Sequence, residues 1–398
     1  AEATYSVTLS RLQGPLGRDH RGAKGLSPSS AAAAAKGSLS SSFSSSPQAA
    51  KMLTRLRGSA TQDLHVVSYN VLSSSLASPS YFLNCEPQHL KAENRFDKLQ
   101  RSLEKEIKER KPVICLQEVS QKWAGPLHCF FQREGYYFVS SHYTRGWQGY
   151  MGSAIAFPTD AWMADEVEVV RLADTKPWPR PLKQTNLLDR VVNFVVEGIS
   201  FLGGGSKKNQ KQDHFDLAKN RMNTMILMKL KNAGGKTFCI ATYHMPCMFW
   251  APKVMVIHTA LAMQKVQDFA KDDPCILAGD FNFKPGDAGY ELATKGDIPT
   301  DHEHFPEPTH PEEQWTPACE YGFESAYLQC TGSEPDFTNY AQIREDPVFI
   351  ECLDYIFHSP SLKCVGVRTL PHRDNVQGPL PNAEEPSDHI MLGASFHL

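Results

Sequence analysis

The sequence predicts an α+β sandwich, in which β-sheets pack face to face and helices cover their outer sides. Many short apolar runs of strand length recur along the chain, and only two segments have the length of long helices. Short strands that outnumber helices in this way indicate stacked sheets rather than a helical bundle. With 398 residues, of which 41% are hydrophobic and 21% charged, the chain is long enough for one large domain or two medium ones.

The first elements are expected between residues 64 and 116. Residues 64–72 are rich in β-forming side chains and predict a strand. Residues 92–111 place apolar side chains at three- and four-residue steps, which predicts an amphipathic helix of about five turns. Pro112 ends that helix, and the apolar run 113–116 that follows is typical of a fully buried strand.

The remaining elements continue this pattern toward the C-terminus. A second long helix is expected over residues 252–270, after Pro252. Residues 203–211, rich in Gly and Lys, predict a flexible basic loop rather than a domain boundary, and no internal repeat is visible. The other apolar runs predict strands at 153–157, 191–196, 225–230, 237–243, 275–278, 353–357 and 390–396.

Residues 1–60 differ in composition from the rest of the chain. The run 27–50 is almost entirely Ser and Ala, and it lacks the apolar surface that would offset its ordering entropy. Eight Lys and Arg face only Glu2 and Asp19 in these sixty residues. We therefore expect a disordered basic leader over 1–60, similar to a transit peptide, and a catalytic domain over 61–398 with an insertion near 160–220.

Charge and cysteine usage exclude several classes of protein. A formal net charge of −3 excludes a globally basic nucleic-acid coat protein, although it leaves room for a local basic groove. No run approaches the roughly 18 apolar residues of a transmembrane helix, so no membrane span is expected. The ten cysteines show no C-x-x-C pair, which predicts reduced thiols of an intracellular protein. The leader favours a mitochondrion or plastid, with the cytoplasm or nucleus as the alternative.

Polar residues follow the predicted strands at four places. They are Asn70, Glu118, the pair Asp280 and Asn282, and the dipeptide Asp388-His389, which Asp354 supports. Taken singly, such residues are typical of solvated strand ends or turns. Their combination at strand ends, where a rigid scaffold holds side chains in place, indicates a site.

These residues belong to segments that occur in the order of a known family. The segments are Tyr69-Asn70-Val-Leu, Cys115-Leu-Gln-Glu118-Val, Thr242-Tyr-His244, Gly279-Asp-Phe-Asn282, Leu353-Asp354-Tyr-Ile-Phe and Pro386-Ser-Asp388-His389. Over residues 64–398 the chain resembles the endonuclease/exonuclease/phosphatase superfamily with its deoxyribonuclease I-like fold. This resemblance implies a four-layer sandwich of two mainly antiparallel sheets flanked by helices.

One further segment resembles a particular branch of that superfamily. Phe337-Thr-Asn-Tyr340, shortly before Leu353, is similar to the deadenylase branch, which includes nocturnin, carbon catabolite repressor deadenylases, angel proteins and the 2′,5′-phosphodiesterase. The chain departs from that branch at Met151-Gly-Ser-Ala154 and at Tyr243-His244-Met245. Neither departure removes a catalytic residue, but both leave open which substrate the protein binds.

The resemblance also implies a role for each matching residue. Glu118 is expected to be the main ligand of Mg²⁺, or of Mn²⁺, with Asn70 and Asp388 completing the site directly or through water, as oxygen ligands suit these cations. His389, oriented by Asp354, is expected to contact the phosphate or move a proton. Asp280 would deprotonate the attacking water, Asn282 would hold it, and His244 would donate to a phosphate oxygen. Substrate binding is expected at Phe337, Asn339, Lys207, Lys208 and Arg221, although a solvated loop and core packing are equally open for the lysines and for Phe337.

The leading functional prediction is a metal-dependent phosphodiesterase that acts on RNA as a 3′ exonuclease of the deadenylase kind. The runner-up is an enzyme for a small phosphoester, such as a 2′,5′-oligoadenylate, a dinucleotide phosphate, or an inositol or lipid head group. A third hypothesis is an enzyme-derived subunit of a larger organellar complex. The expected partners are accordingly RNA or a nucleotide, and proteins of such a complex.

Overall fold

The computed structural model describes residues 63–178, 213–308 and 311–398. The expected leader over 1–60 and the expected strand over 191–196 lie outside these residues. Lys207 and Lys208 lie outside them as well. No helix of the described residues is long and apolar enough to cross a membrane.

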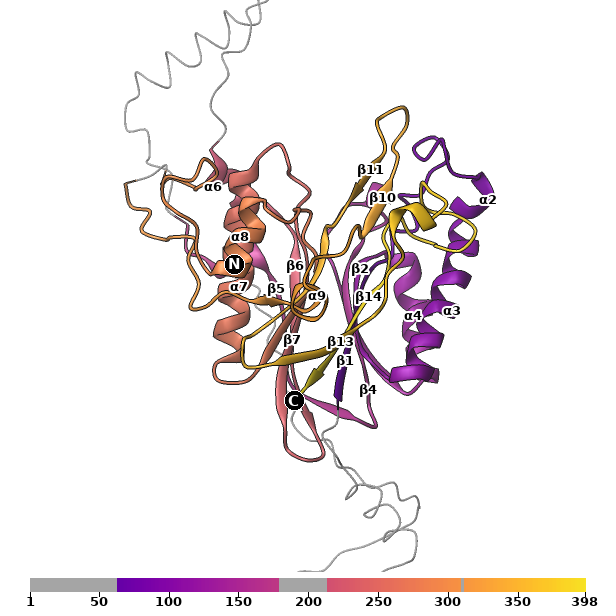
Figure 1. The fold of residues 1–398 in the computed structure, drawn as a ribbon, viewed down its shortest axis with the longest axis horizontal. Helices are drawn as coiled ribbons and strands as arrows, with labels where there is room; N and C mark the ends of the chain where they lie inside the picture. The colour runs from indigo at the N-terminus through magenta and orange to yellow at the C-terminus, as the bar shows by residue number, and fades with distance from the viewer. Residues whose placement is uncertain (1–62, 179–212, 309–310) are drawn as a thin grey trace, which may run out of the picture. The chain divides into compact units, whose positions relative to one another are not determined.

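Two six-stranded sheets form the framework of the described residues (Figure 1). The first sheet has the order β13-β14-β1-β2-β4-β3 and the second β5-β6-β7-β8-β12-β9. The strands of the first sheet are β1 (Asp63–Asn70), β2 (Val113–Val119), β3 (Tyr136–His142), β4 (Gly152–Pro158), β13 (Lys363–Val367) and β14 (Leu392–His397). Those of the second are β5 (Trp162–Arg171), β6 (Thr224–Asn232), β7 (Thr237–His244), β8 (Cys275–Asp280), β9 (Glu324–Ser325) and β12 (Asp354–His358).

Each sheet is antiparallel except for one parallel pair at its centre. β1 pairs in parallel with β2 in the first sheet, and β7 pairs in parallel with β8 in the second. Parallel neighbours end at the same edge of a sheet, so residues that follow such strands are brought together. The mainly antiparallel sheets expected from the sequence are confirmed, and the parallel pairs supply the edge on which the site is built.

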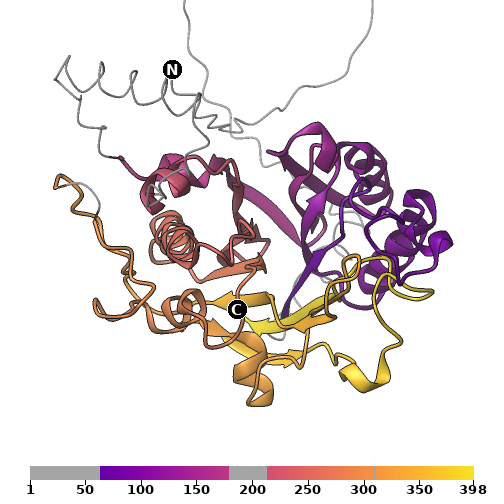
Figure 2. The ribbon, with the colours of Figure 1, turned by 90° about the horizontal axis from the view of Figure 1, so that it is seen from above.

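Helices cover the outer face of each sheet (Figure 2). α3 (Ala92–Arg110) and α4 (Gln121–Arg133) pack on the first sheet, and α7 (Pro252–Ala270) and α8 (Ala288–Lys295) on the second. The two long helices lie where their periodicity predicted them. α3 ends at Lys111, which adopts a left-handed conformation directly before Pro112, and a proline there prevents the helix from continuing. The shorter helices are α2 (Pro87–Leu90), α6 (His214–Lys219) and α9 (Ala326–Thr331).

Three apolar layers hold this arrangement together. Side chains of both sheets, among them Val66 and Ile276, meet in the layer between the sheets. The other two layers lie between each sheet and its helices, with Leu103 and Ile257 as examples. The predicted four-layer sandwich is therefore confirmed, since burying both faces of both sheets requires one central and two outer layers.

Part of the segment expected as an insertion belongs to the framework itself. β5 forms an edge of the second sheet and pairs with β6 along its whole length. Its side chains do not alternate strictly between buried and exposed. Such a pattern is compatible with an edge strand that has one covered face. A separate two-stranded hairpin, β10 (Asn339–Ala341) and β11 (Phe349–Glu351), rises above the sheets (Figure 1).

Candidate active site

The candidate site lies where the central strands of both sheets end. His244, Asp280 and Asp354 occupy adjacent register positions on β7, β8 and β12, because His244 pairs with Asp280 and Asp280 with Asp354. In the first sheet Asn70 pairs with Gln117, the residue before Glu118. Strand register alone therefore brings together residues that are far apart in the sequence.

Asp280 is the centre of this group. Its Oδ2 accepts a hydrogen bond from Asn70 Nδ2 at 2.9 Å, and its Oδ1 accepts the Asn282 backbone N–H at 3.0 Å. Two imidazoles flank the same carboxylate, with His244 Nε2 at 3.5 Å and His389 Nε2 at 3.7 Å from Oδ2. The carboxylate is thus held from two sides and faces two proton-bearing groups.

His389 forms a buried pair with Asp354. His389 Nδ1 lies 2.7 Å from Asp354 Oδ2, which also accepts the Thr338 hydroxyl at 2.6 Å. Burial raises the pKa of the Asp354 carboxyl. Burial alone would lower the pKa of His389, but the charges of Asp354 and Asp280 outweigh it and hold that pKa well above its usual range. The imidazole is therefore kept as a cation at neutral pH, with its orientation set by Asp354.

Glu118 lies on an irregular stretch of β2. The register with β4 shifts between Leu116 and Val119, and Glu118 itself has φ +60°, which is rare for any residue but glycine. Its carboxylate accepts Asn70 Nδ2 at 3.3 Å and the Ser73 backbone N–H at 2.9 Å. Such local strain is typical of functional positions, where it aims a side chain away from the regular alternation of the strand.

The Asp388 carboxyl lies within the electrostatic influence of Glu118. Burial raises the pKa of the Asp388 carboxyl, and the negative charge of Glu118 raises it further, against the opposing effect of His389 and Arg95. Two neighbouring carboxylates that repel each other in this way are stabilised when a cation lies between them. Asn70 is placed differently, because its Oδ1 accepts the Leu72 N–H at 3.0 Å and its Nδ2 faces Glu118 and Asp280. Its amide nitrogen therefore orients the two carboxylates, while its oxygen is already engaged by the backbone. The expected contact of Asn70 with a cation would then run through water.

A second set of ligand atoms lies close by, on Asp280, Asp354 and His389. One atom from each lies within 4.8 Å of the other two, a spacing that a metal ion would also accept. Within this trio, His389 Nδ1 and Asp354 Oδ2 already form a direct hydrogen bond. This trio is a further candidate for a metal ion besides the carboxylates of Glu118 and Asp388.

Three residues of the site lie outside the sequence-based prediction. Tyr143 places its hydroxyl 3.2 Å from His244 Nδ1, and Thr338 bridges Asp354 to the backbone of Leu353. Arg95 is completely buried and donates to the carbonyls of Val71, Leu72, Ser73 and Pro386. Arg95 could have been found, because it lies four residues before Leu99 on the apolar stripe of α3, where an arginine needs buried acceptors. Tyr143 and Thr338 carry no comparable signal.

The expected substrate-binding residues that the structure describes differ in their surroundings. Phe337 is fully buried and packs with Leu380 and Ile390, which agrees with the core-packing alternative rather than with a ring that stacks on a base. Asn339 is buried beside the site, where its backbone bridges to that of His389. Arg221 is partly exposed at the site end of β6, but its Nε donates to the Leu217 carbonyl.

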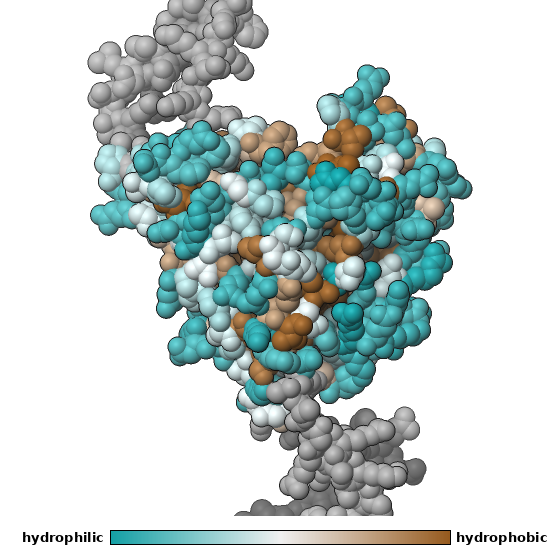
Figure 3. All heavy atoms as spheres, in the orientation of Figure 1, coloured by the Kyte–Doolittle hydropathy of each residue, from teal (hydrophilic) through white to brown (hydrophobic). Residues whose placement is uncertain are grey.

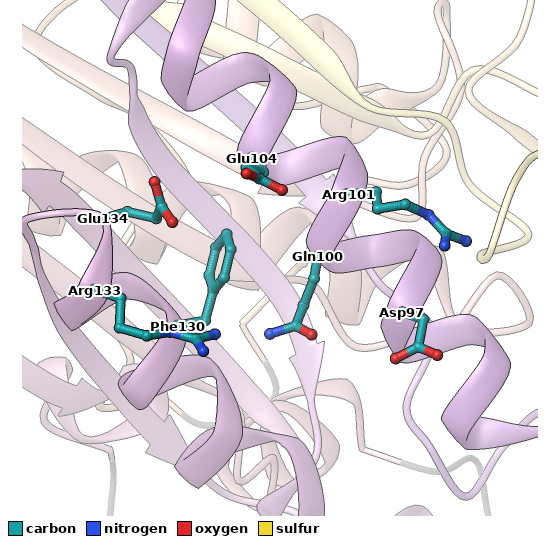
Figure 4. A pocket seen from close by; sticks show the side chains of 7 residues that line it. All are labelled: Asp97, Gln100, Arg101, Glu104, Phe130, Arg133 and Glu134. Carbon is teal, nitrogen blue, oxygen red and sulfur yellow. The ribbon is translucent and has the colours of Figure 1, made fainter.

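A surface hollow between α3 and α4 is unrelated to this chemistry (Figure 4). It is lined by Asp97, Gln100, Arg101, Glu104, Phe130, Arg133 and Glu134. None of the predicted site residues reaches it. Its side chains carry charges of both signs, as on an ordinary solvated helix surface, and we place the active site at the strand ends instead.

The structure has two packed sheets, and their central strands end in a shared cluster of carboxylates, amides and imidazoles. This arrangement defines the class of deoxyribonuclease I-like proteins. The sequence agrees, because the profile of the endonuclease/exonuclease/phosphatase family matches residues 67–389. The chain belongs to that family.

Relatives of known sequence come from the expected branch. Carbon catabolite repressor protein 4 homolog 4 of Arabidopsis thaliana is 34% identical over 167 residues, 38% of this chain and 36% of that protein. The CCR4-Not complex 3′-5′-exoribonuclease subunit Ccr4 of Aspergillus niger is 25% identical over 383 residues, 85% of this chain and 52% of that protein. The chain spans between a third and about half of the length of these relatives.

Solved structures support the same fold. ANGEL2, described as a 2′,3′-cyclic phosphatase, superposes with a TM-score of 0.63 at 18% identity, over 85% of this chain and 99% of that one. The catalytic domain of human nocturnin, with a bound sulfate anion, gives 0.52 at 19% identity, over 84% of this chain and 93% of that one. At these identities the similarity concerns architecture, and the resemblance to the deadenylase branch is confirmed by the relatives together with this fold.

Proposed function

We propose that this protein is a metal-dependent phosphodiesterase that hydrolyses RNA from the 3′ end. The observation that carries the proposal is the contact of Asp280 with both His244 and His389 at the strand ends, next to Glu118. A base, two imidazoles and a cation site in one cluster supply the groups that phosphodiester hydrolysis needs. The relatives named as exoribonuclease subunits favour RNA among the phosphoester substrates.

The charge and position of each site residue suggest its role in the hydrolysis. Asp280, held by Asn70 and by the Asn282 backbone, is placed to orient the attacking water and accept its proton. The His389 cation stabilises the negative charge that develops on the phosphoryl group, and Asp354 fixes the ring that carries it. His244, fixed by Tyr143, donates to a second phosphoryl oxygen.

Glu118 and Asp388 would hold the cation at the opposite side of the cluster. Mg²⁺ or Mn²⁺ bound there would supply positive charge that balances the charge of the phosphodiester. Asn70 keeps the Glu118 carboxylate in place through its amide, so the geometry of the cation site depends on β1 as well as β2.

The test is hydrolysis of a 5′-labelled oligoadenylate with Mg²⁺, followed by separation of the products. We expect shortening from the 3′ end, loss of activity with a chelator, and recovery when Mg²⁺ is added back. A 2′,5′-oligoadenylate and an inositol polyphosphate serve as the competing substrates. Faster turnover of either one would replace the proposed substrate while keeping the reaction class.

Glu118→Ala gives the matching test on the protein side. The variant should lose activity while its melting temperature changes little, because Glu118 is partly exposed at a strand end and leaves the packed layers intact. Glu134→Ala, at the partly exposed residue that follows α4, is the matched control and should keep both properties. A collapse of the melting temperature in Glu118→Ala would make Glu118 a structural residue instead.

A further inference from the structure

Two loops that leave the site carry four exposed aromatic side chains. Trp147 and Tyr150, between β3 and β4, are 70% and 52% exposed. Phe249 and Trp250, between β7 and α7, are 76% and 58% exposed. The face drawn in Figure 3 is largely hydrophilic with scattered hydrophobic patches. Both loops leave the strand ends that carry the site, because Gly152 of β4 pairs beside the end of β2 and His244 of β7 pairs with Asp280. Four large exposed rings at this end of the strands favour a binding partner.

The first of these loops is tied directly to the site. Ser73 Oγ donates to the Gln148 carbonyl at 2.8 Å, and the backbone N–H of the same Ser73 donates to Glu118 at 2.9 Å. The loop begins at Tyr143, whose hydroxyl lies 3.2 Å from His244. Trp147 is therefore one residue from a group that is anchored to the proposed cation ligand.

The second loop starts inside the site. The Met245 N–H donates to the Asp280 carbonyl at 2.8 Å, and its carbonyl accepts Asn282 Nδ2 at 2.9 Å. The chain that carries Phe249 and Trp250 thus leaves the site beside the backbone of Asp280 and the amide of Asn282.

We propose that Trp147, Tyr150, Phe249 and Trp250 form a rim that stacks on the nucleobases next to the scissile phosphate. This inference rests on the proposed function and narrows its substrate to a nucleobase-bearing, single-stranded chain. Aromatic faces bind successive bases without regard to sequence, whereas an inositol ring or a lipid head group offers no flat face to stack on. Arg145, exposed in the same loop as Trp147, adds positive charge for a neighbouring phosphate.

The test is binding rather than turnover, and it uses the full chain in the presence of EDTA. Quenching of tryptophan fluorescence reports the binding of a short oligoadenylate, and an abasic ribose-phosphate oligomer of equal length serves as the second probe. Each of Trp147→Ala and Phe249→Ala should weaken oligoadenylate binding by about 10-fold to 100-fold and leave the abasic oligomer unaffected. Tyr137→Ala, an exposed aromatic at the other end of β3, is the matched control and should change neither affinity.

The outcomes separate this inference from the proposed function. Equal affinity of the rim variants and the native protein for oligoadenylate would overturn the rim, even if the protein hydrolyses RNA. Strong, rim-dependent binding of oligoadenylate without hydrolysis in Mg²⁺ would support the rim and overturn the proposed reaction.

An independent feature lies where the edges of the two sheets meet. Cys330 Sγ on α9 and Cys364 Sγ on β13 are 2.8 Å apart. The Cys364 backbone N–H donates to Gln329 Oε1 at 2.8 Å, which holds the two segments together beside the thiols. Cys330 is partly exposed, and Cys364 is buried.

From this geometry we infer that Cys330 and Cys364 form a reversible disulfide with a small-molecule disulfide such as oxidised glutathione. The exposed Cys330 thiolate attacks one sulfur of glutathione disulfide and releases one glutathione thiolate. The Cys364 thiolate then attacks Cys330 Sγ and releases the second glutathione. Two protein thiols are thereby oxidised, and one external disulfide is reduced to two thiols.

The bond would close a loop of the chain that contains Thr338 and Asp354. A cross-link over a segment of this length restricts the unfolded chain, and we expect a rise in melting temperature of roughly 5 °C or more. The site itself keeps its residues, because neither sulfur belongs to the hydrogen-bonded cluster around Asp280. The expected consequence is therefore a stiffer frame around the Asp354 side of the site.

Mass spectrometry of the full chain after incubation with glutathione disulfide tests this inference. The expected product is a peptide pair joined through Cys330 and Cys364 and lighter by two hydrogens, with the higher melting temperature reversed by a thiol reductant. Cys364→Ser should abolish both effects, and Cys319→Ser, at another partly exposed cysteine, should abolish neither. Free thiols or separate glutathione adducts at both positions would overturn it.

Discussion

The Asp354–His389 pair shows how the chemistry of one side chain depends on its partner. His389 alone would be an ordinary buried histidine that loses its proton, because burial disfavours the cation. Asp354 at 2.7 Å reverses that preference, and Thr338 fixes the carboxylate in turn. The sequence shows all three residues but not the distances that join them.

Replacing Asp354 by Asn should therefore affect the rate rather than the binding of substrate. The amide keeps the shape but not the charge, so the pKa of His389 falls and less of the cation remains at neutral pH. We expect kcat to fall by about 10²-fold to 10⁴-fold with a small change in KM. The decline of activity at alkaline pH should begin at a lower pH in the variant. Full turnover with reduced stability would show that Asp354 only supports β12.

His258 predicts how stability responds to acid. Its Nε2 donates to the Ala218 carbonyl at 3.0 Å, so its Nδ1 accepts the Tyr243 hydroxyl at 2.8 Å and the ring is neutral. Burial lowers its pKa from 6.5 to about 4. The unfolded chain therefore takes up a proton before the folded one, and stability is lost as pH falls from about 6.5 to about 4.

His258 is expected to lower the free energy of unfolding by about 3 kcal/mol as the pH falls over that range. Denaturant unfolding at pH 7 and pH 4.5 should show a smaller loss for His258→Gln than for the native protein. His128→Gln, at an exposed position on α4, should leave the loss unchanged. Identical losses in native protein and His258→Gln would assign the acid response to other groups.

At the scale of elements, α3 connects the outer layer to the site. Its apolar stripe buries Leu99 and Leu103 against the first sheet, and Arg95 continues that stripe toward the strand ends. Burial lowers the pKa of Arg95 to about 10, against the opposing charge of Asp388. The guanidinium lies 5.0 Å from the Trp123 ring and gathers backbone carbonyls from the loop after β1 and from Pro386. One helix thus fixes the segment that follows Asn70 and the segment that precedes Asp388.

Arg95→Met should consequently damage both stability and activity. It leaves several buried carbonyls without a donor, which costs about 3–5 kcal/mol in the free energy of unfolding. The KM for metal and substrate should rise as the loops loosen. Arg101→Met, on the exposed side of the same helix, is the matched control for helix propensity and charge. Equal stability of the two variants would contradict the clamping role of Arg95.

At the scale of the whole molecule, the described site and its core lie within one part of the chain. The site residues span Asn70 to His389, and the apolar layers begin at Leu64. The leader over 1–60 and the basic residues Lys207 and Lys208 remain predictions, since they fall outside the described residues.

Removal of residues 1–60 should therefore leave kcat and the melting temperature unchanged. The reason is that the segment lacks the periodic apolar residues that a stable, packed element needs. Steady-state kinetics on oligoadenylate and a thermal melt of the shortened protein check this directly. A rise in KM alone would assign substrate binding to the leader, and a lower melting temperature would assign it a structural role.

The local elements and the candidate residues of this protein follow from its sequence, because they depend on short-range chemistry. The spacing of apolar residues set α3 and α7, and the proline after Lys111 set the end of a helix. Asn70, Glu118, Asp280, Asp354 and His389 could be chosen because each follows or begins an apolar run.

Only the tertiary structure decided how these residues combine. The parallel register of β7 and β8, and the bulge that turns Glu118, depend on contacts between distant strands, which no local pattern encodes. The same contacts buried Phe337 in the core and placed Asn70 with its amide nitrogen toward the carboxylates. Sequence determines which chemical groups are present at strand ends, and packing determines which of them meet, because distance and burial are properties of the folded chain alone.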